Sequence, residues 1–190
     1  MLYSHQMLKQ MQSPGGKGLD PRTGVYLIGV INMFASLAST RIVKMFGRKP
    51  LVIWGHAGIA MVHFAIGILN NMDNNLGVLL LLLLFLVLYQ NTSGPVAWLY
   101  AAETNIDSAL GFCLLVLWGT VFVLSLVCPI LMSTPDQGGI GPSNVFFMLG
   151  AFNVAGSIYS KFVLKETRGL TDKDKKLLFT PERYRRDLKN

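Results

Sequence analysis

Charge, cysteine and histidine are all scarce in this chain of 190 residues. Charged residues make up 14% of it and hydrophobic residues 52%, whereas a typical soluble domain carries roughly 25% charged residues. This composition excludes an ordinary water-soluble globular domain and indicates a membrane protein. The two cysteines, Cys113 and Cys128, lie in one apolar run, which argues against a framework of disulfides.

Catalytic and metal-binding patterns are also missing. The sequence contains no Ser-His-Asp set, no His-Glu-x-x-His and no phosphate-binding loop ending in Gly-Lys-Ser/Thr. His56 and His63 share a helix face, but seven residues separate them, which is about 10 Å of helical rise. Two ligands of one ion would need a third partner at that distance. We therefore expect interior histidines bonded to neighbours, with no metal, no cofactor and no enzymatic activity.

Five long apolar runs are present instead. About 20 apolar residues cross a bilayer as a helix, so the runs predict an all-α integral membrane fold with spans at about 24–43, 51–69, 76–102, 109–132 and 144–164. Residues 1–23 are then an extracellular segment, and residues 165–190 a basic tail. The third run is long enough to need tilt, a kink or protrusion; a short segment at 76–88 followed by a re-entrant loop is the alternative.

Lysine and arginine are distributed unevenly between the connections. Four of them surround the first connection at Phe46 and ten follow Tyr159, whereas the loops 70–75 and 133–143 have none. The positive-inside rule therefore places the Phe46 connection and the tail in the cytoplasm. Because the tail interleaves its bases with acids, a topology signal or contact with anionic lipid is favoured over nucleic-acid binding.

Polar residues interrupt the third run at its centre. Residues 89–98 read Tyr-Gln-Asn-Thr-Ser-Gly-Pro-Val-Ala-Trp. Pro95 has no N–H and should free the carbonyl of Asn91 one turn earlier, so we expect a broken helix. Neutral amides and hydroxyls both donate and accept hydrogen bonds, which suits a neutral polyol with Trp98 stacked on its face. Hydrogen bonds between helices are the alternative, and the lone amide of Asn32 in the first span is open to both explanations.

No Asp, Glu, Lys or Arg lies deep inside any of the five runs. Proton-coupled transport normally requires a titratable group within the membrane. These residues therefore supply no proton-coupling group of that kind.

Three short motifs follow one another along the chain. Phe-Gly-Arg-Lys-Pro at 46–50 follows the first span, Gly-Pro-Val-Ala-Trp-Leu-Tyr-Ala-Ala-Glu at 94–103 lies in the broken span, and Lys-Glu-Thr-Arg-Gly-Leu-Thr at 165–171 follows the last span. In this order and spacing they resemble the C-terminal half of a sugar porter, in the glucose-transporter-like branch of the major facilitator superfamily. The resemblance implies five transmembrane helices that form most of the C-terminal bundle, after a remnant of helix 7.

The resemblance also implies roles by position. Residues that contact the sugar would be Asn32, Gln90 and Trp98, and Gly94 with Pro95 would form a hinge in the broken helix. A cytoplasmic gating network would comprise Arg48, Lys49, Glu103, Glu166 and Arg168.

The implied activity is alternating-access transport of a hexose-like sugar, in the plasma membrane, by a complete twelve-helix protein. The expected partners are the sugar, the lipid bilayer and a missing N-terminal helical bundle, with no nucleic acid. A non-transporting membrane subunit, or a truncated fragment that acts only through helix contacts, is the alternative. Uniport and proton-coupled symport are both open.

Overall fold

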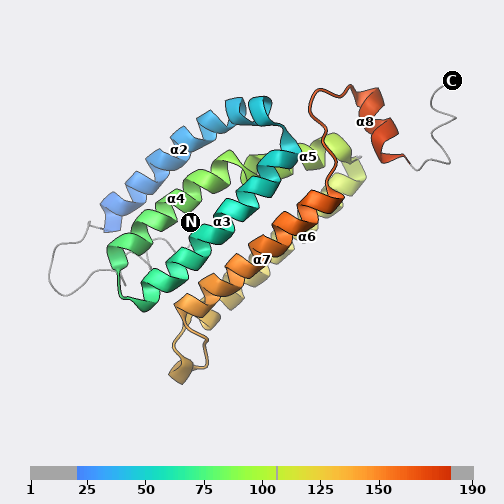
Figure 1. Ribbon diagram of the computed structural model, residues 1–190. Helices are drawn as coiled ribbons and strands as arrows, with labels where there is room; N and C mark the ends of the chain where they lie inside the picture. Colours follow the sequence, from blue (N-terminus) through green and yellow to red (C-terminus); the bar gives the residue numbers. More distant parts are fainter. Residues whose placement is uncertain (1–20, 106, 181–190) are drawn as a thin grey trace.

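The computed structural model describes residues 21–105 and 107–180, and these ranges are helical throughout apart from short connections. Most of the predicted extracellular segment 1–23 and the end of the tail therefore lie outside the described residues. The helices (Figure 1) are α2 (Pro21–Phe46), α3 (Arg48–Asn71), α4 (Asn75–Asn91), α5 (Ser93–Thr104), α6 (Asp107–Met132), the short 3₁₀ helix η1 (Pro135–Gln137), α7 (Pro142–Val163) and α8 (Asp172–Phe179).

Four stretches of the described chain are long and apolar enough to cross a membrane. They are Arg48–Asn71, Asn75–Thr104, Ala109–Met132 and Pro142–Val163. These correspond to the second to fifth predicted spans, and each of the four helical stretches begins one to three residues before its predicted apolar run. The 26-residue helix α2 covers the remaining run, whose crossing of the membrane stays a prediction.

The core of the bundle lies around α3, which packs along α7 on one side and α4 on the other, while α2 packs on α4. Two glycines make the contact between α3 and α7 close. A Cβ atom on Gly67 would stand 2.6 Å from the ring of Phe147, and one on Gly150 would stand 2.8 Å from the ring of Phe64. Each phenylalanine thus lies over a glycine of the facing helix, and neither position has room for a side chain.

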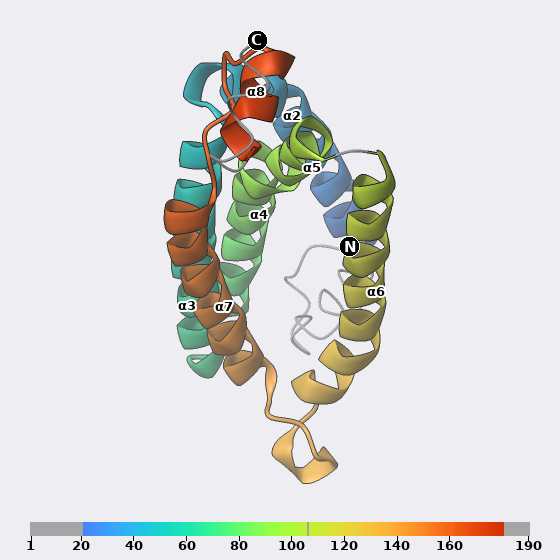
Figure 2. The same ribbon diagram turned by 90° about the vertical axis from the view of Figure 1, so that its right-hand side faces the viewer.

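Helix α6 is the most exposed element of the bundle. Figure 2 shows it standing apart from α3 and α4, and none of the residues in its most apolar stretch is buried. The helix is apolar on all sides, which is typical of a surface that faces lipid or further helices. Both cysteines lie on it and neither is in a disulfide.

The connections that carry charged residues gather at one end of the bundle. The turn at Gly47, the end of α5 and the segment between α7 and α8 meet there, whereas the turn after α3 and η1 lie at the opposite end (Figure 2). This arrangement is what the predicted topology requires, because it places the Phe46 connection and the tail on the same side.

Candidate functional site

The third apolar run is broken at Thr92, whose backbone has φ −126° and ψ −93°. The side chains at the end of α4 bond back to carbonyls of the preceding turn. Asn91 Nδ2 donates to the carbonyl of Val87 at 2.8 Å, and Thr92 Oγ1 donates to the carbonyl of Leu88 at 2.6 Å. The carbonyl of Leu88 is one of the last four of α4, which the end of a helix leaves without partners, so the hydroxyl of Thr92 satisfies it.

The break precedes the proline that led us to expect it. Pro95 is the third residue of α5, within the first turn, where backbone N–H groups have no partner inside the helix and the missing N–H costs nothing. Gly94 is confined, since a Cβ atom there would stand 3.0 Å from the carbonyl oxygen of Tyr89. The two residues proposed as a hinge therefore form the start of the second half-helix.

Gly55 of α3 faces the break, and the sequence reading did not single it out. A Cβ atom on Gly55 would stand 2.5 Å from Cβ of Thr92 and 3.0 Å from Oγ of Ser93. Only a glycine lets α3 approach this closely. A glycine within an apolar helix often marks a close approach of two helices. The sequence could therefore have indicated Gly55.

Two of the three residues expected to contact a sugar bond to each other. Gln90 Nε2 of α4 donates to Asn32 Oδ1 of α2. Further along the chain at the break, Asn91 Oδ1 and Ser93 Oγ are buried and have no hydrogen-bond partner among the described residues. Trp98 lies on α5 and is 43% exposed; within the described ranges no hydrogen bond or ring contact joins it to either amide. The amide pair is therefore assembled, whereas Trp98 is not part of it.

The two histidines of α3 are linked through Asn153 of α7. Asn153 Oδ1 lies 2.9 Å from Nδ1 of His56, and Asn153 Nδ2 lies 3.5 Å from Nδ1 of His63. The ring of His63 also packs on those of Phe85 and Phe146, with centroids 5.1 and 6.0 Å apart. Interior histidines bonded to neighbours are what the sequence predicts, but it gave no indication that Asn153 is the partner.

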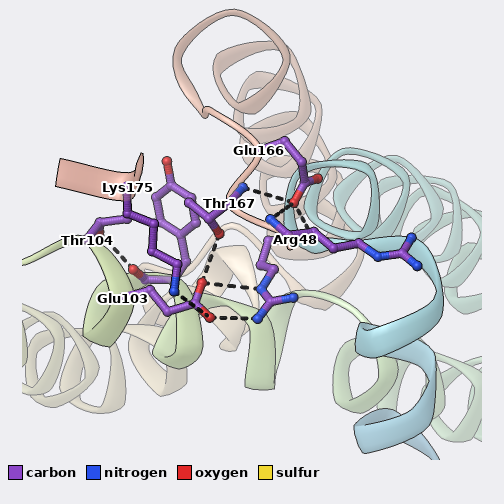
Figure 3. A network of polar contacts seen from close by, with 8 residues as sticks. Arg48, Glu103, Thr104, Glu166, Thr167 and Lys175 are labelled. Carbon is purple, nitrogen blue, oxygen red and sulfur yellow. Dashed lines mark hydrogen bonds and ion pairs between the residues drawn. The ribbon is translucent and has the colours of Figure 1, made fainter. Parts of the chain in front are cut away.

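At the end of the bundle where the charges gather, the Glu166 carboxylate caps helix α3 (Figure 3). It accepts from the N–H groups of Arg48 and Lys49, the first two residues of α3, at 3.0 Å each. The local N-cap, Gly47, has no side chain to do so; its φ is +89°, and a Cβ atom there would stand 2.8 Å from Glu166 Oε2. The cap of α3 thus comes from a residue 118 positions away.

Glu103, next to the last residue of α5, binds the same arginine (Figure 3). Arg48 Nη2 lies 2.6 Å from Glu103 Oε1 and Arg48 Nε lies 3.3 Å from Oε2, a bidentate pair of the strong, charge-assisted kind. Thr167, which is 1% exposed, donates its hydroxyl to Glu103 Oε2 at 2.8 Å, and Lys175 Nζ of α8 lies 3.7 Å from Oε1. Arg48 therefore ties α3 to both α5 and the tail.

The five residues predicted for a gating network all meet here, though not all through their charges. Lys49 takes part through its backbone N–H. Arg168 donates its backbone N–H to Glu166 Oε1 at 2.9 Å and its guanidinium to the carbonyl of Met45. Thr167 and Lys175 belong to the same network and were not predicted. We call these residues the latch: Arg48, Lys49, Glu103, Glu166, Thr167, Arg168 and Lys175.

Helix α8 docks beside the latch. Lys165 Nζ donates to the carbonyl of Leu178 at 2.9 Å, and the ring of Phe179 meets that of Tyr100 edge-on, with centroids 6.4 Å apart. The start of α8 carries a side-chain cap, in which Thr171 Oγ1 and Asp174 Oδ2 are 2.7 Å apart. Such a Thr-x-x-Asp pair ahead of apolar residues resembles a capping box, and it could have revealed this helix in the sequence.

Comparison with known proteins gives the fold a family. The family model described as "Sugar (and other) transporter" matches residues 1–178. The chain is 27% identical over 150 residues to hexose transporter 1 of Plasmodium falciparum, covering 73% of this chain and 28% of that protein. It is 28% identical over 152 residues to the major myo-inositol transporter IolT of Bacillus subtilis, covering 75% of this chain and 31% of that protein. The chain thus spans less than a third of the length of either relative.

Solved structures of the xylose transporter XylE from E. coli share the fold. The proton:xylose symporter XylE bound to 6-bromo-6-deoxy-D-glucose matches with a TM-score of 0.80 at 21% identity, over 94% of this chain and 38% of that one. A double tryptophan mutant of XylE matches with a TM-score of 0.83 at 22% identity. These relatives and neighbours are transporters rather than enzymes. With the family match over residues 1–178 and a fold shared with XylE, the chain belongs to the sugar transporter family of the major facilitator superfamily.

Proposed function

We propose that this chain forms the C-terminal bundle of a transporter that moves a hexose-like sugar across a membrane. The observation that carries the proposal is the Gln90–Asn32 amide pair beside the break, with the buried Oδ1 of the adjacent Asn91. Polar groups without partners cost several kcal/mol each, by order of magnitude, in hydrocarbon. A neutral polyhydroxylated solute would satisfy such groups, since each of its hydroxyls can both donate and accept.

The latch supplies a physical basis for alternating access. Helix α5 begins at the break and carries Glu103 in its last turn, so a change at one end of this short helix is transmitted to the other. With Arg48 bound to Glu103, α3, α5 and the tail are held together at one end of the bundle. A bound sugar would shift the balance only by binding one of the two states more tightly. Gly94 and Pro95, in the first turn of α5, are the hinge about which the half-helix would turn.

The complete transporter would contain a further bundle. The chain spans less than a third of the length of its relatives, and the apolar surface of α6 is open to further helices or lipid. We place α2 as the first of five spans, the latch and α8 on the cytoplasmic side, and the protein in the plasma membrane. An antibody against residues 170–190 tests whether the native protein contains the further bundle. A native band more than twice the mass of this chain supports it, whereas a band at 21 kDa alone contradicts it.

The transport proposal is tested by counterflow of radiolabelled glucose and xylose in proteoliposomes that hold the complete protein. Asn32→Ala and Gln90→Ala should each slow counterflow about tenfold, the effect of one lost hydrogen bond of about 1.4 kcal/mol. The double variant should be little worse than either single one, because the two amides act as a pair. Trp98→Ala should also slow counterflow if its exposed ring stacks on the sugar.

The matched control is Thr120→Val on α6, which removes a neutral polar group whose hydroxyl bonds only to its own helix, at Val116. Its counterflow should equal that of the unaltered protein. If the two amide variants are folded and transport as fast as this control, the amide pair does not bind the sugar. If the unaltered protein exchanges neither sugar, the non-transporting alternative is correct.

A further inference from the structure

We propose that a second pocket in the bundle binds a lipid whose headgroup is a single neutral hydroxyl, such as a sterol or a diacylglycerol. The pocket has a volume of about 520 Å³ and lies between α3, α5 and α7. Its lining residues are Val52, His56, Ser93, Ala97, Tyr100, Ala101, Thr104, Asn105, Gly156, Tyr159, Ser160 and Leu164. The amide pair and Trp98 are not among them, so the pocket is distinct from the site proposed for the sugar.

A buried hydroxyl without a partner faces this pocket. Ser93 is 7% exposed, and its Oγ has no hydrogen-bond partner among the described residues. Two other hydroxyls of the lining are satisfied: Ser160 Oγ donates to the carbonyl of Gly156 at 2.7 Å, and Thr104 Oγ1 donates to that of Tyr100 at 2.7 Å. An unsatisfied buried hydroxyl costs about as much free energy as a lost hydrogen bond. Ser93 is therefore poised to bind a ligand atom.

His56 presents a second polar atom, and the hydrogen bonds of Asn153 determine its character. Asn153 Nδ2 donates to the carbonyl of Leu149 at 2.9 Å, which leaves Asn153 Oδ1 as the atom 2.9 Å from His56 Nδ1. An amide oxygen only accepts, so Nδ1 of His56 carries the proton. In the neutral ring Nε2 is then an acceptor, and no described residue donates to it.

Ser93 of α5 and His56 of α3 both line the pocket, where these two helices are in contact. Ser93 Oγ lies 3.0 Å from the position of a Cβ on Gly55, the residue just before His56. One hydroxyl of a ligand could donate to Nε2 of His56 and accept from Oγ of Ser93. This donor and acceptor set matches a neutral alcohol.

The remaining walls indicate what the alcohol is attached to. Val52, Ala97, Ala101 and Leu164 are apolar, and no Lys, Arg, Asp or Glu lines the pocket. A charged headgroup would find no counter-charge, and most hydroxyls of a sugar would meet apolar wall. An apolar body with one hydroxyl fits both parts of the lining, and the membrane supplies such molecules as sterols and diacylglycerols.

Photolabelling of the complete protein in phosphatidylcholine nanodiscs tests the proposal, because phosphatidylcholine has no free hydroxyl. The probes are a diazirine sterol and a diazirine diacylglycerol, with labelled peptides mapped by mass spectrometry. We expect at least one probe to label α5 or α7 at the pocket, and which one does so identifies the lipid. The unlabelled parent alcohol should compete, whereas its methyl ether, which cannot donate to His56, should compete at least tenfold less well.

Two variants on α5 separate occupancy of the pocket from general damage. Ala97 is an exposed part of the pocket wall, so Ala97→Trp fills the pocket without disturbing buried packing and should abolish labelling. Ala102→Trp adds the same side chain at an exposed position outside the lining and should leave labelling intact. Ser93→Ala should weaken competition by the parent alcohol about tenfold. Labelling confined to other surfaces, labelling that persists in Ala97→Trp, or equal competition by the methyl ether would each overturn the proposal.

Discussion

Removing the charge of Glu166 should open the start of helix α3. Oε1 of Glu166 accepts from the backbone N–H groups of Arg48, Thr167 and Arg168, and Oε2 accepts from that of Lys49. Glu166→Gln can keep an oxygen on one side only. If the remaining oxygen takes the place of Oε1, which accepts three bonds, the new NH2 group takes the place of Oε2. Its N–H groups then point at the N–H of Lys49.

The size of the effect follows from these four bonds. Hydrogen bonds to a charged group contribute about 1.5–3 kcal/mol each and neutral ones about 0.5–1.5 kcal/mol, and a negative charge at a helix N-terminus adds about 0.3–1 kcal/mol. Glu166→Gln removes one hydrogen bond, and the other three no longer have a charged acceptor. Water reaches this end of the bundle and offsets part of the lost free energy. We expect the local opening free energy of the first turn of α3 to fall by about 2 kcal/mol.

Hydrogen exchange measured by mass spectrometry gives a local readout of this change. A loss of about 2 kcal/mol corresponds to roughly 30-fold faster exchange, expected in peptides that contain the backbone amides of Arg48 and Lys49. Asp136→Asn is the matched control, since it removes the same charge from an exposed loop at the opposite end. If Glu166→Gln and Asp136→Asn give the same exchange rates at the start of α3, the carboxylate does not cap this helix and the latch is misinterpreted.

Three further substitutions, the first with a matched control, test the break and the contact between α3 and α7. Gly55→Ala should lower the melting temperature in detergent and slow transport, because its Cβ would stand 2.5 Å from that of Thr92; Gly58→Ala, whose nearest neighbour would be 3.6 Å away, should do neither. Asn153→Leu removes the partner of both α3 histidines and should cost about 1–3 kcal/mol of stability in denaturant titrations; unchanged stability would show that water satisfies those rings. Pro95→Ala restores an N–H that can bond the carbonyl of Asn91 and let α4 continue into α5; this should stiffen the hinge and slow counterflow, so equal turnover would remove the hinge role.

The sequence predicts the elements of this fold better than their contacts. Apolar runs identified the second to fifth spans because hydrophobicity is a local property, readable within one helix length. The break at Thr92 was also readable, since polar residues and a proline cannot continue an apolar span without help from neighbours. Helix α8 was missed because its few apolar residues are short of a span, and only its Thr171–Asp174 cap marks it.

The contacts that join the helices depend on residues far apart in the sequence. Asn153 bonds to His56 across 97 positions and Arg48 bonds to Glu166 across 118, and no periodicity within a single helix can indicate such a pair. Five of the seven latch residues could be predicted only because three short motifs resemble a known family, and Thr167 and Lys175 were not predicted. Motif resemblance gave their positions but not their chemistry: it suggested a network of side-chain charges, whereas Glu166 and Lys49 act on and through the backbone.

That difference in chemistry bears on how the latch could open. A network of exposed side-chain charges is weakened by salt, since such charges are screened over about 8 Å at physiological ionic strength. The carboxylate of Glu166, by contrast, is bonded to backbone N–H groups that cannot move away unless the first turn of α3 or the segment after α7 moves with them. Arg48 couples the two parts, because its backbone N–H binds Glu166 while its guanidinium binds Glu103. Release of Glu103 alone would leave α3 capped and free α5, and α5 is the half-helix that begins at the break.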